Sequence, residues 1–211
     1  MKQGQFITLE GTEGGGKSTN LGFIESFLLE QGVDVLVTRE PGGTEVGEAI
    51  RSILLNKNFS NMCDDAELLL MFAARAQHIQ EKIKPALAAG KWVISDRFTD
   101  ATYAYQGGAR GGDFERIAQI EQWAQQGFQP NLTFIFDLSV KEGMARVLSR
   151  SQQTGQIMDR FELEKQAFFE KVRATYLDRA KACPERYEVL DASQPLEQVQ
   201  RCIQARLLRV L

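Results

Sequence analysis

Histidine, cysteine and long apolar runs are all scarce in this chain of 211 residues. Its single histidine, His78, excludes histidine-based triads and histidine-rich metal sites, so the chemistry must use carboxylates, cations and backbone dipoles. The three cysteines are odd in number and far apart, which argues against a disulfide framework or a zinc site and favours buried, reduced thiols. No stretch approaches the roughly 20 apolar residues that span a membrane, and the first residues lack a secretion-signal pattern. We therefore expect a cytoplasmic protein with no membrane partner.

Positive charge is not in excess either. The net charge is -3 and the pI is near 5.4, so the chain lacks the basic field that holds a nucleic-acid backbone. An anionic ligand must instead meet a local cluster of cations, which suits small phosphorylated molecules and not a nucleic-acid polymer. With 43% hydrophobic residues the length suits one sizeable core, and we expect a single domain over residues 1–211.

Short apolar runs of strand composition alternate with segments of helical spacing. The runs fall at residues 6–9, 33–37, 92–94, 132–136 and 189–190. Residues 21–28 and 68–83 carry apolar stripes at helical spacing. This alternation predicts an α/β fold, in which a parallel sheet has helices on both faces and ligands bind beyond the carboxyl ends of the strands.

A glycine-rich segment at residues 11–18 follows the first predicted strand and leads into the first predicted helix. It reads GTEGGGKS, an unbroken G-x-x-x-x-G-K-[ST] phosphate-binding loop, or P-loop. Backbone N–H groups and the helix N-terminus would cradle phosphates, Lys17 would face the β- and γ-phosphates, and Ser18 would hold Mg²⁺. The alternative is a glycine-rich turn with an incidental lysine. The motif predicts nucleotide binding, but ATPases, GTPases and kinases all share it.

Cations gather where such a fold would place a second phosphorylated ligand. Arg39 and Arg97 follow predicted strands, whereas Arg51 and Arg75 lie on predicted helices. Each alone is typical of a solvated surface charge, but together they fit the convergence that two neighbouring polyanions require. Asp96, directly after an apolar strand, is placed either to hold the metal or to cap the next helix.

Taken together, these motifs resemble the bacterial thymidylate kinases over nearly the whole chain. The matching segments are ITLEGTEGGGKST at 7–19, TREPGGT at 38–44, FAAR at 72–75, SDRF at 95–98, AYQGGAR at 104–110 and DRF at 159–161. The resemblance implies a P-loop NTPase-type three-layer fold, with a five-stranded parallel sheet flanked by helices and a short lid at about residues 149–161. It also implies a homodimer that converts ATP and dTMP into ADP and dTDP with Mg²⁺.

The resemblance assigns roles to residues on both sides of the site. ATP contacts would come from Gly11, Thr12, Glu13, Gly14, Gly15, Gly16, Lys17, Ser18, Thr19, Arg146, Arg150 and Asp191. dTMP contacts would come from Glu13, Arg39, Glu40, Pro41, Arg51, Phe72, Arg75, Arg97, Thr102, Tyr105 and Gln106. Within this set Gln106 and Arg75 would face the thymine edges, Tyr105 would lie beside the sugar, and Glu13 would meet the sugar 3′-hydroxyl or metal-bound water. Ser18 and Asp96 would hold the metal.

One departure from the family concerns the thymine stack. Several members place the stacking phenylalanine four residues before the arginine, where this chain has Met71, while Phe72 lies three before Arg75. Both spacings keep the pair on one helical face, so Phe72 is expected to stack on thymine, with a purely core role as the alternative.

The predicted lid must supply an arginine, because the P-loop of this chain contains none. Family members place that arginine either in the P-loop or in the lid. Arg146, Arg150 and Arg160 are the choices here, and Arg150 could instead stack on adenine; solvation of helix ends is the alternative for all three. The expected catalytic group consists of Lys17, Arg97, Glu13, Arg150 and Arg160. The polar run at 149–156 is expected to be a solvated loop between two helices.

Two other functions remain possible at the level of sequence. One is a P-loop kinase for another pyrimidine monophosphate or a deoxynucleoside, which a comparison of acceptors would distinguish. The other is an ATPase or regulatory switch whose arginines bind a protein, which predicts ATP hydrolysis without an acceptor.

Overall fold

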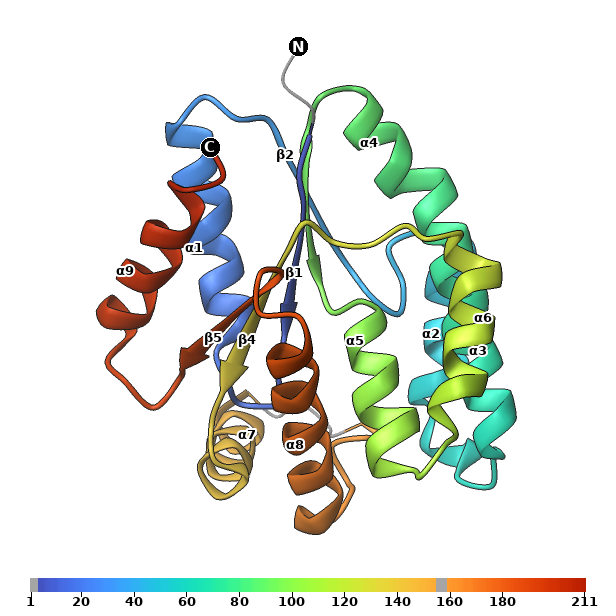
Figure 1. The fold of residues 1–211 in the computed structure, drawn as a ribbon. Coiled ribbons are helices and arrows are strands. Elements are labelled where there is room, and N and C mark those ends of the chain that lie inside the picture. The colour runs from blue at the N-terminus through green and yellow to red at the C-terminus, as the bar shows by residue number, and fades with distance from the viewer. Residues whose placement is uncertain (1–3, 155–158) are drawn as a thin grey trace.

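Five parallel strands, in the order β2-β3-β1-β4-β5, form the central sheet of the computed structural model, which describes residues 4–154 and 159–211 (Figure 1). The strands are β1 (Phe6–Glu10), β2 (Val35–Arg39), β3 (Trp92–Asp96), β4 (Leu132–Asp137) and β5 (Tyr187–Asp191). The five-stranded parallel sheet expected from the sequence is confirmed. The strands extend past the apolar runs, so that Arg39, Asp96 and Asp191 end β2, β3 and β5 instead of following them.

Helices cover both faces of the sheet. They are α1 (Lys17–Glu30), α2 (Glu45–Leu55), α3 (Asp64–His78), α4 (Lys84–Ala88), α5 (Thr99–Thr102), α6 (Phe114–Gln125), α7 (Val140–Thr154), α8 (Gln166–Ala182) and α9 (Leu196–Leu207). The short 3-10 helix η1 (Lys57–Phe59) and the π-helical segments η2 (Ile79–Ile83) and η3 (Tyr103–Ala109) complete the helical part. Figure 1 shows α1 and α9 on one face and α4, α5 and α8 on the other.

Alternation along each strand divides the core between the two faces. Ile7 and Leu9 of β1 pack into the cluster that contains α1 and α9, whereas Phe6 packs on the opposite side against Phe98. Ile135 of β4 likewise packs against α8. Successive side chains of a strand point to opposite faces, so a sheet buried on both faces requires this nearly continuous apolar sequence.

Residues 149–154 of the polar run at 149–156 are helical, unlike the expected loop. Helix α7 continues through Thr154, and residues 155–158 lie outside the described part of the chain. Low hydrophobicity marks an exposed helix surface as readily as a loop, because an α-helix satisfies its own backbone groups wherever it faces water. Over residues 149–153 the polar composition therefore indicates a mostly exposed surface, as expected, but the backbone is a helix instead of a loop.

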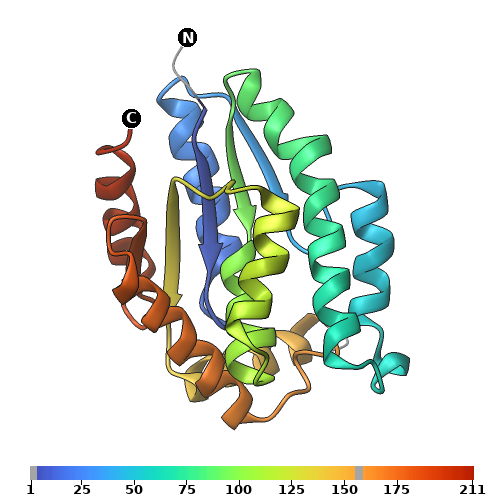
Figure 2. The ribbon, with the colours of Figure 1, turned by 45° about the vertical axis from the view of Figure 1, so that its right-hand side comes forward.

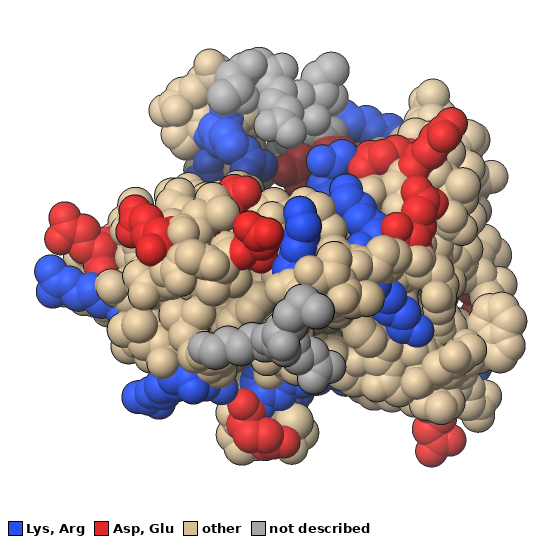
Figure 3. All heavy atoms as spheres, turned by 90° about the horizontal axis from the view of Figure 1, so that it is seen from above, with Lys and Arg blue, Asp and Glu red and all other residues tan. Residues whose placement is uncertain are grey.

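The cysteines also differ from expectation. Cys63 and Cys202 are exposed and Cys183 is half-buried, although all three are free thiols. Each lies near a helix end or on an outer helix face, where packing does not select the residue type. None of the helices in the described residues is long and apolar enough to cross a membrane. Figure 3 shows basic and acidic side chains interspersed over the face that it presents.

Candidate active site at the carboxyl ends of the strands

A cavity of about 620 Å³ opens where the carboxyl ends of the strands meet. Most of the predicted site residues line it, from both the nucleotide and the acceptor groups. They are Glu13, Gly14, Gly15, Gly16, Lys17, Ser18, Thr19, Arg39, Glu40, Pro41, Arg51, Arg75, Asp96, Arg97, Thr102, Tyr105, Gln106, Arg146 and Arg150. Five predicted residues lie outside this wall: Gly11, Thr12, Phe72, Arg160 and Asp191.

The P-loop joins β1 to α1 through glycines in conformations that other residues rarely adopt. Gly14 has φ 78° and Gly16 has φ 85°, and a Cβ on Gly14 would lie 2.4 Å from the backbone oxygen of Gly143. Lys17 begins α1 and donates from Nζ to the backbone oxygens of Gly11 (3.0 Å) and Thr12 (2.9 Å). Gly11 and Thr12 therefore hold Lys17 instead of lining the cavity. Burial, followed by the charge of Arg97, lowers the pKa of Lys17.

Arg97 occupies a strained position directly after β3. Its φ of 71° lies in the left-handed region, which a non-glycine residue adopts only at a cost of about 1–3 kcal/mol. Its guanidinium contacts the carboxylate of Glu13, and its Nη1 donates to the backbone oxygen of Gly11 and to the hydroxyl of Tyr176, both at 3.2 Å. The guanidinium also lies 5.0 Å from the ring centroid of Tyr105. Arg97 thus joins the end of β3 to the P-loop.

A buried carboxyl group behind the site holds this corner in place. Glu10 accepts hydrogen bonds from the backbone N–H of Phe98 (2.7 Å) and the hydroxyl of Tyr176 (2.8 Å). Burial, and then the charge of Asp100, raises the pKa of Glu10 to about 8, although Arg97 lowers it. Glu10 was not a predicted site residue. The sequence feature that could have identified it is a charged residue at the end of an otherwise apolar strand.

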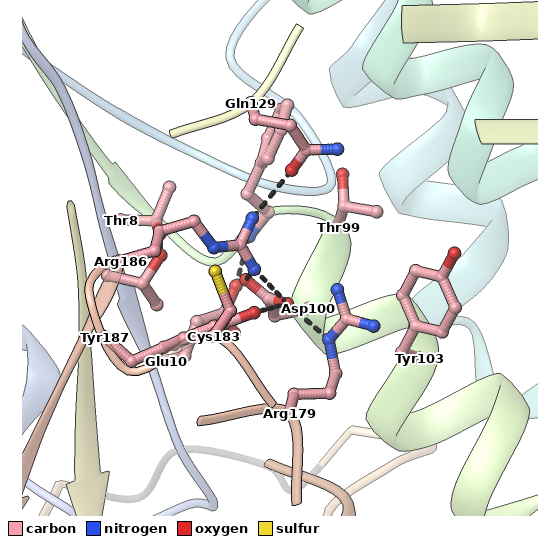
Figure 4. A network of polar contacts seen from close by, with 12 residues as sticks. Thr8, Glu10, Thr99, Asp100, Tyr103, Gln129, Arg179, Cys183, Arg186 and Tyr187 are labelled. Carbon is pink, nitrogen blue, oxygen red and sulfur yellow. Dashed lines mark hydrogen bonds and ion pairs between the residues drawn. The ribbon is translucent and has the colours of Figure 1, made fainter. Parts of the chain in front are cut away.

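Asp100 is the centre of a second polar network behind the cavity (Figure 4). Its carboxylate accepts from Nε of Arg179 (2.5 Å), Nη2 of Arg186 (2.9 Å) and the hydroxyl of Tyr187 (2.6 Å). These partners come from α8, the segment that follows it and the start of β5, whereas Asp100 lies on α5. The network therefore ties α5, whose last residue Thr102 lines the cavity, to α8 and to the start of β5.

The four predicted acceptor arginines line one cavity, but their present partners differ. Arg75 is buried and donates from Nε to Glu40 (2.8 Å) and from Nη2 to the backbone oxygen of Phe98 (3.1 Å). Arg51 donates to the backbone oxygen of Pro41 at 2.8 Å. Arg39 is half-exposed and pairs with Glu48 at 2.9 Å. The cavity thus brings the four arginines together, and their role as acceptor contacts stays a prediction.

Phe72 does not take the place expected for it. Its ring is 3% exposed, packs with Leu68, Tyr103 and Ile117, and lies 4.9 Å from the guanidinium carbon of Arg75. Met71 lines the cavity instead. Adjacent helix positions are about 100° apart, so a one-residue shift in register exchanges the core face for the cavity face. The core role, which the sequence left as the alternative, fits Phe72.

The three candidate lid arginines lie in different places. Arg146 reaches the backbone oxygens of Gly14 and Ala192, both at 3.3 Å, and lines the cavity. Arg150 also lines it and pairs with Glu162 at 2.9 Å. Arg160 lies outside the wall and contacts the carboxylate of the buried Glu67. Glu67 is another residue that was not predicted from the sequence. The feature that could have identified it is an acidic residue beside the apolar stripe of α3.

Asp191 does not contribute to the cavity. Its carboxylate accepts from the backbone N–H (3.0 Å) and hydroxyl (2.5 Å) of Ser193 and from the side chain of Gln194 (2.8 Å). These contacts are typical of a turn. Through the backbone oxygen of Ala192, the same turn meets Arg146.

The residues expected to hold Mg²⁺ suit that ion. Ser18 and Asp96 both line the cavity, and Asp96 Oδ1 is buried with no hydrogen-bond partner among the described residues. Mg²⁺ is commonly held by one or two protein oxygens together with substrate phosphates and water. A buried carboxylate oxygen without a partner beside a phosphate-binding loop therefore fits a metal site.

Comparisons with known proteins agree on one family. The family model described as "Thymidylate kinase" matches residues 9–203. A thymidylate kinase of Pseudomonas putida (strain W619) is 56% identical over 98% of this chain and 97% of that protein. One from Ruthia magnifica is 50% identical over the full length of both. The crystal structure of thymidylate kinase from Ehrlichia chaffeensis superposes with a TM-score of 0.77 at 32% identity, covering 98% of this chain and 99% of that one.

Proposed function

Because the chain belongs to the thymidylate kinase family and phosphorylates dTMP to dTDP in the synthesis of dTTP, we propose that ATP and dTMP meet in the cavity described above. The observation that carries this assignment is the presence of the P-loop and four arginines in one wall. Two unit charges about 4 Å apart repel by about 4 kcal/mol at an effective dielectric of 20, so the triphosphate of ATP and the phosphate of dTMP need such cations around them.

The P-loop side holds ATP. Backbone N–H groups of residues 13–18 and the N-terminus of α1 face the phosphates, and Lys17 exchanges its present backbone partners for phosphate oxygens. Arg146, which bridges the P-loop and the turn after β5, lies where it can meet the adenine side of the nucleotide. Gly11 and Thr12 support the loop from behind, and Thr19 lies in the first turn of α1.

The arginine side holds dTMP. Arg39, Arg51 and Arg97 surround its phosphate, while Arg75 and Gln106 face the thymine, with Met71 beside it in place of Phe72. Thr102, Tyr105, Glu40 and Pro41 complete this wall, and Glu13 lies between the two nucleotides near the sugar.

The transfer needs positioning and charge compensation. An oxygen of the dTMP phosphate forms a bond to the γ-phosphorus of ATP as the bond to the β,γ-bridging oxygen breaks, and that electron pair leaves with ADP. Lys17, Arg97 and Arg150 surround the transferring group and stabilise the charge that develops on its oxygens. Arg160 lies outside the cavity wall and influences the site through its ion pair with Glu67.

Mg²⁺ accompanies ATP in this proposal, with Ser18 and Asp96 as the protein groups that hold it directly or through water. When bound, the ion neutralises phosphate charge and orients the β- and γ-oxygens.

We also propose a cytoplasmic homodimer of single-domain subunits, each with a lid near residues 149–161. Helices α2, α3 and α6 stand beside one another at the side of the molecule away from α9 (Figures 1 and 2). Large exposed apolar side chains lie on or beside these helices, namely Ile53, Phe59, Leu69, Phe114 and Trp123. Light scattering should give twice the 23.7 kDa subunit mass. A mass of one subunit at micromolar concentration would contradict this proposal.

The acceptor assignment is tested by initial rates with dTMP, dUMP, UMP, CMP and thymidine at fixed ATP. We expect the highest kcat/KM with dTMP and no transfer to thymidine, because thymidine lacks the phosphate that the arginines hold. Equal rates with all monophosphates, or ATP hydrolysis that no acceptor accelerates, would contradict the proposed base and phosphate contacts.

A further inference from the structure

Gln106 reaches the cavity from η3, but one end of its side chain is held from behind. Its Nε2 donates to Oε1 of Glu67 at 2.7 Å, and both side chains are buried. Glu67 comes from α3 and does not line the cavity, whereas Gln106 does. The contact therefore connects a cavity residue to a buried carboxylate that no proposed ligand contact uses.

Cations surround the other side of Glu67. Its Oε2 contacts Nη2 of Arg160, and Nε of Arg110 lies 3.6 Å from its Oε1. A guanidinium can only donate hydrogen bonds, so these neighbours need Glu67 as an acceptor. Arg110 also pairs with Glu164 at 2.7 Å, which gives the same cluster a second carboxylate that does not contact Gln106.

A carboxylate beside an amide determines which way the amide faces. An ionised carboxylate accepts hydrogen bonds and cannot donate them, so Gln106 must turn its NH₂ group toward Glu67. Its carbonyl oxygen then faces away from Glu67, and within the described residues Oε1 accepts no hydrogen bond. Gln106 therefore offers the cavity a hydrogen-bond acceptor.

Pyrimidine bases differ in what they present to such an acceptor. At N3, thymine carries a donor (N3–H) and cytosine a lone pair. At position 4 the pattern is reversed, because thymine carries an acceptor oxygen and cytosine an amino donor. We propose that Glu67 is a specificity-determining positioning residue, which selects thymine over cytosine by locking the amide of Gln106 with its oxygen toward N3 of the base. This inference rests on the proposed placement of the thymine beside Gln106.

The test compares dTMP with 5-methyl-dCMP, which keeps the methyl group and changes only the donor and acceptor pattern of the base edge. In Glu67→Gln, the new amide oxygen faces Arg160 and its NH₂ faces Gln106, so the Gln106 amide reverses and offers a donor to the base. The ratio of kcat/KM for dTMP to that for 5-methyl-dCMP should fall at least about tenfold. Equal losses for both acceptors would overturn the proposal, since a merely structural role predicts them.

Glu164→Gln is the matched control, because it removes the other carboxylate partner of Arg110 and leaves Gln106 untouched. Its ratio should stay within about twofold of the wild type. Should Glu67→Gln fail to fold, the double variant Glu67→Gln/Arg160→Gln replaces the buried charge pair by two amides and is compared with Arg160→Gln alone. Any effect of Arg160 on phosphoryl transfer cancels in the ratio. An unchanged ratio in the double variant overturns the proposal.

Gln106→Ala separates this inference from the function on which it rests. If Gln106→Ala lowers the ratio and the folded Glu67 variants do not, the thymine lies beside Gln106 but Glu67 does not control it. If Gln106→Ala leaves the ratio unchanged, the proposed base placement is wrong and the inference is overturned with it.

Discussion

Arg97 and Glu13 form an ion pair that joins the strained end of β3 to the P-loop. The side chains are 15% and 28% exposed, so water screens the pair only in part. Burial raises the pKa of Glu13, but the charges of Arg97 and Lys17 outweigh it and lower that pKa to about 2. A carboxylate in the middle of a phosphate-binding site therefore stays ionised without repelling the loop around it.

The first prediction concerns Glu13→Gln. The folded pKa is about 2 and the ordinary value is 4.5, so the ionised carboxylate stabilises the fold at neutral pH and progressively loses this effect as the pH falls from about 4.5 to about 2. The variant should be less stable by about 1–3 kcal/mol at pH 7, and the difference should shrink between pH 5 and pH 3. Urea unfolding at these pH values measures it, with the exposed Glu197→Gln as the control. A difference that does not change with pH would contradict the pKa.

The second prediction concerns Glu10→Gln and has the opposite sign. Because burial and then Asp100 raise the folded pKa of Glu10 to about 8, the folded state keeps a proton that the unfolded state has lost between pH 4.5 and pH 8. Wild-type stability should therefore decrease as pH rises through this range, whereas glutamine has no proton to lose. Relative to the wild type, the variant should gain about 3–5 kcal/mol between pH 5 and pH 8.5 in urea unfolding. A parallel pH dependence in both proteins would show that Glu10 does not titrate there.

The parts of the molecule that the sequence predicted best are those fixed by local rules. The P-loop was found because its glycines and Lys17 occur in order between a strand and a helix, and the apolar runs found every strand because a sheet covered on both faces must be apolar. The ends of elements were less accurate. Strand hydrogen bonds continue past the last apolar residue, as at Arg39 and Asp96.

What the sequence could not give depends on orientation and on contacts distant in the chain. Met71 and Phe72 are adjacent in the chain, and only the packing of α3 against α6 and η3 decides which of them faces the cavity. The partners of Glu67 lie 39 and 93 residues away, so no local pattern could reveal them. The same holds for Asp100, whose contacts span α5 and the start of β5.

The third prediction concerns Asp100→Asn, which removes the charge shared by Arg179, Arg186 and Tyr187 (Figure 4). Two guanidinium groups would then lose their buried partner, and breaking such a pair costs about 3–5 kcal/mol. Asp178→Asn is the matched control, because Asp178 is exposed, lies on α8 and pairs only at the surface with Lys181. It should change the free energy of unfolding by less than about 0.5 kcal/mol. Similar losses in both variants would mean that the network does not anchor α5.

The fourth prediction distinguishes the lid arginines. Arg150 lines the cavity beside the P-loop, Arg146 contacts the backbone of Gly14 and Ala192, and Arg160 is held by Glu67 outside the wall. Arg150→Ala should therefore lower kcat by about 10³ or more, whereas Arg146→Ala should mainly raise the KM for ATP. Arg160→Ala should lower kcat by less than about tenfold.

Single-turnover rates with dTMP and saturating ATP measure this difference, because they report the transfer step apart from product release. A loss of about 10³ corresponds to about 4 kcal/mol of barrier, which only a group beside the transferring phosphoryl can supply. If Arg160→Ala shows that loss and Arg150→Ala does not, Arg160 must leave Glu67 when both nucleotides bind. The ratio of kcat/KM for dTMP to that for 5-methyl-dCMP should then change with the occupancy of the ATP site.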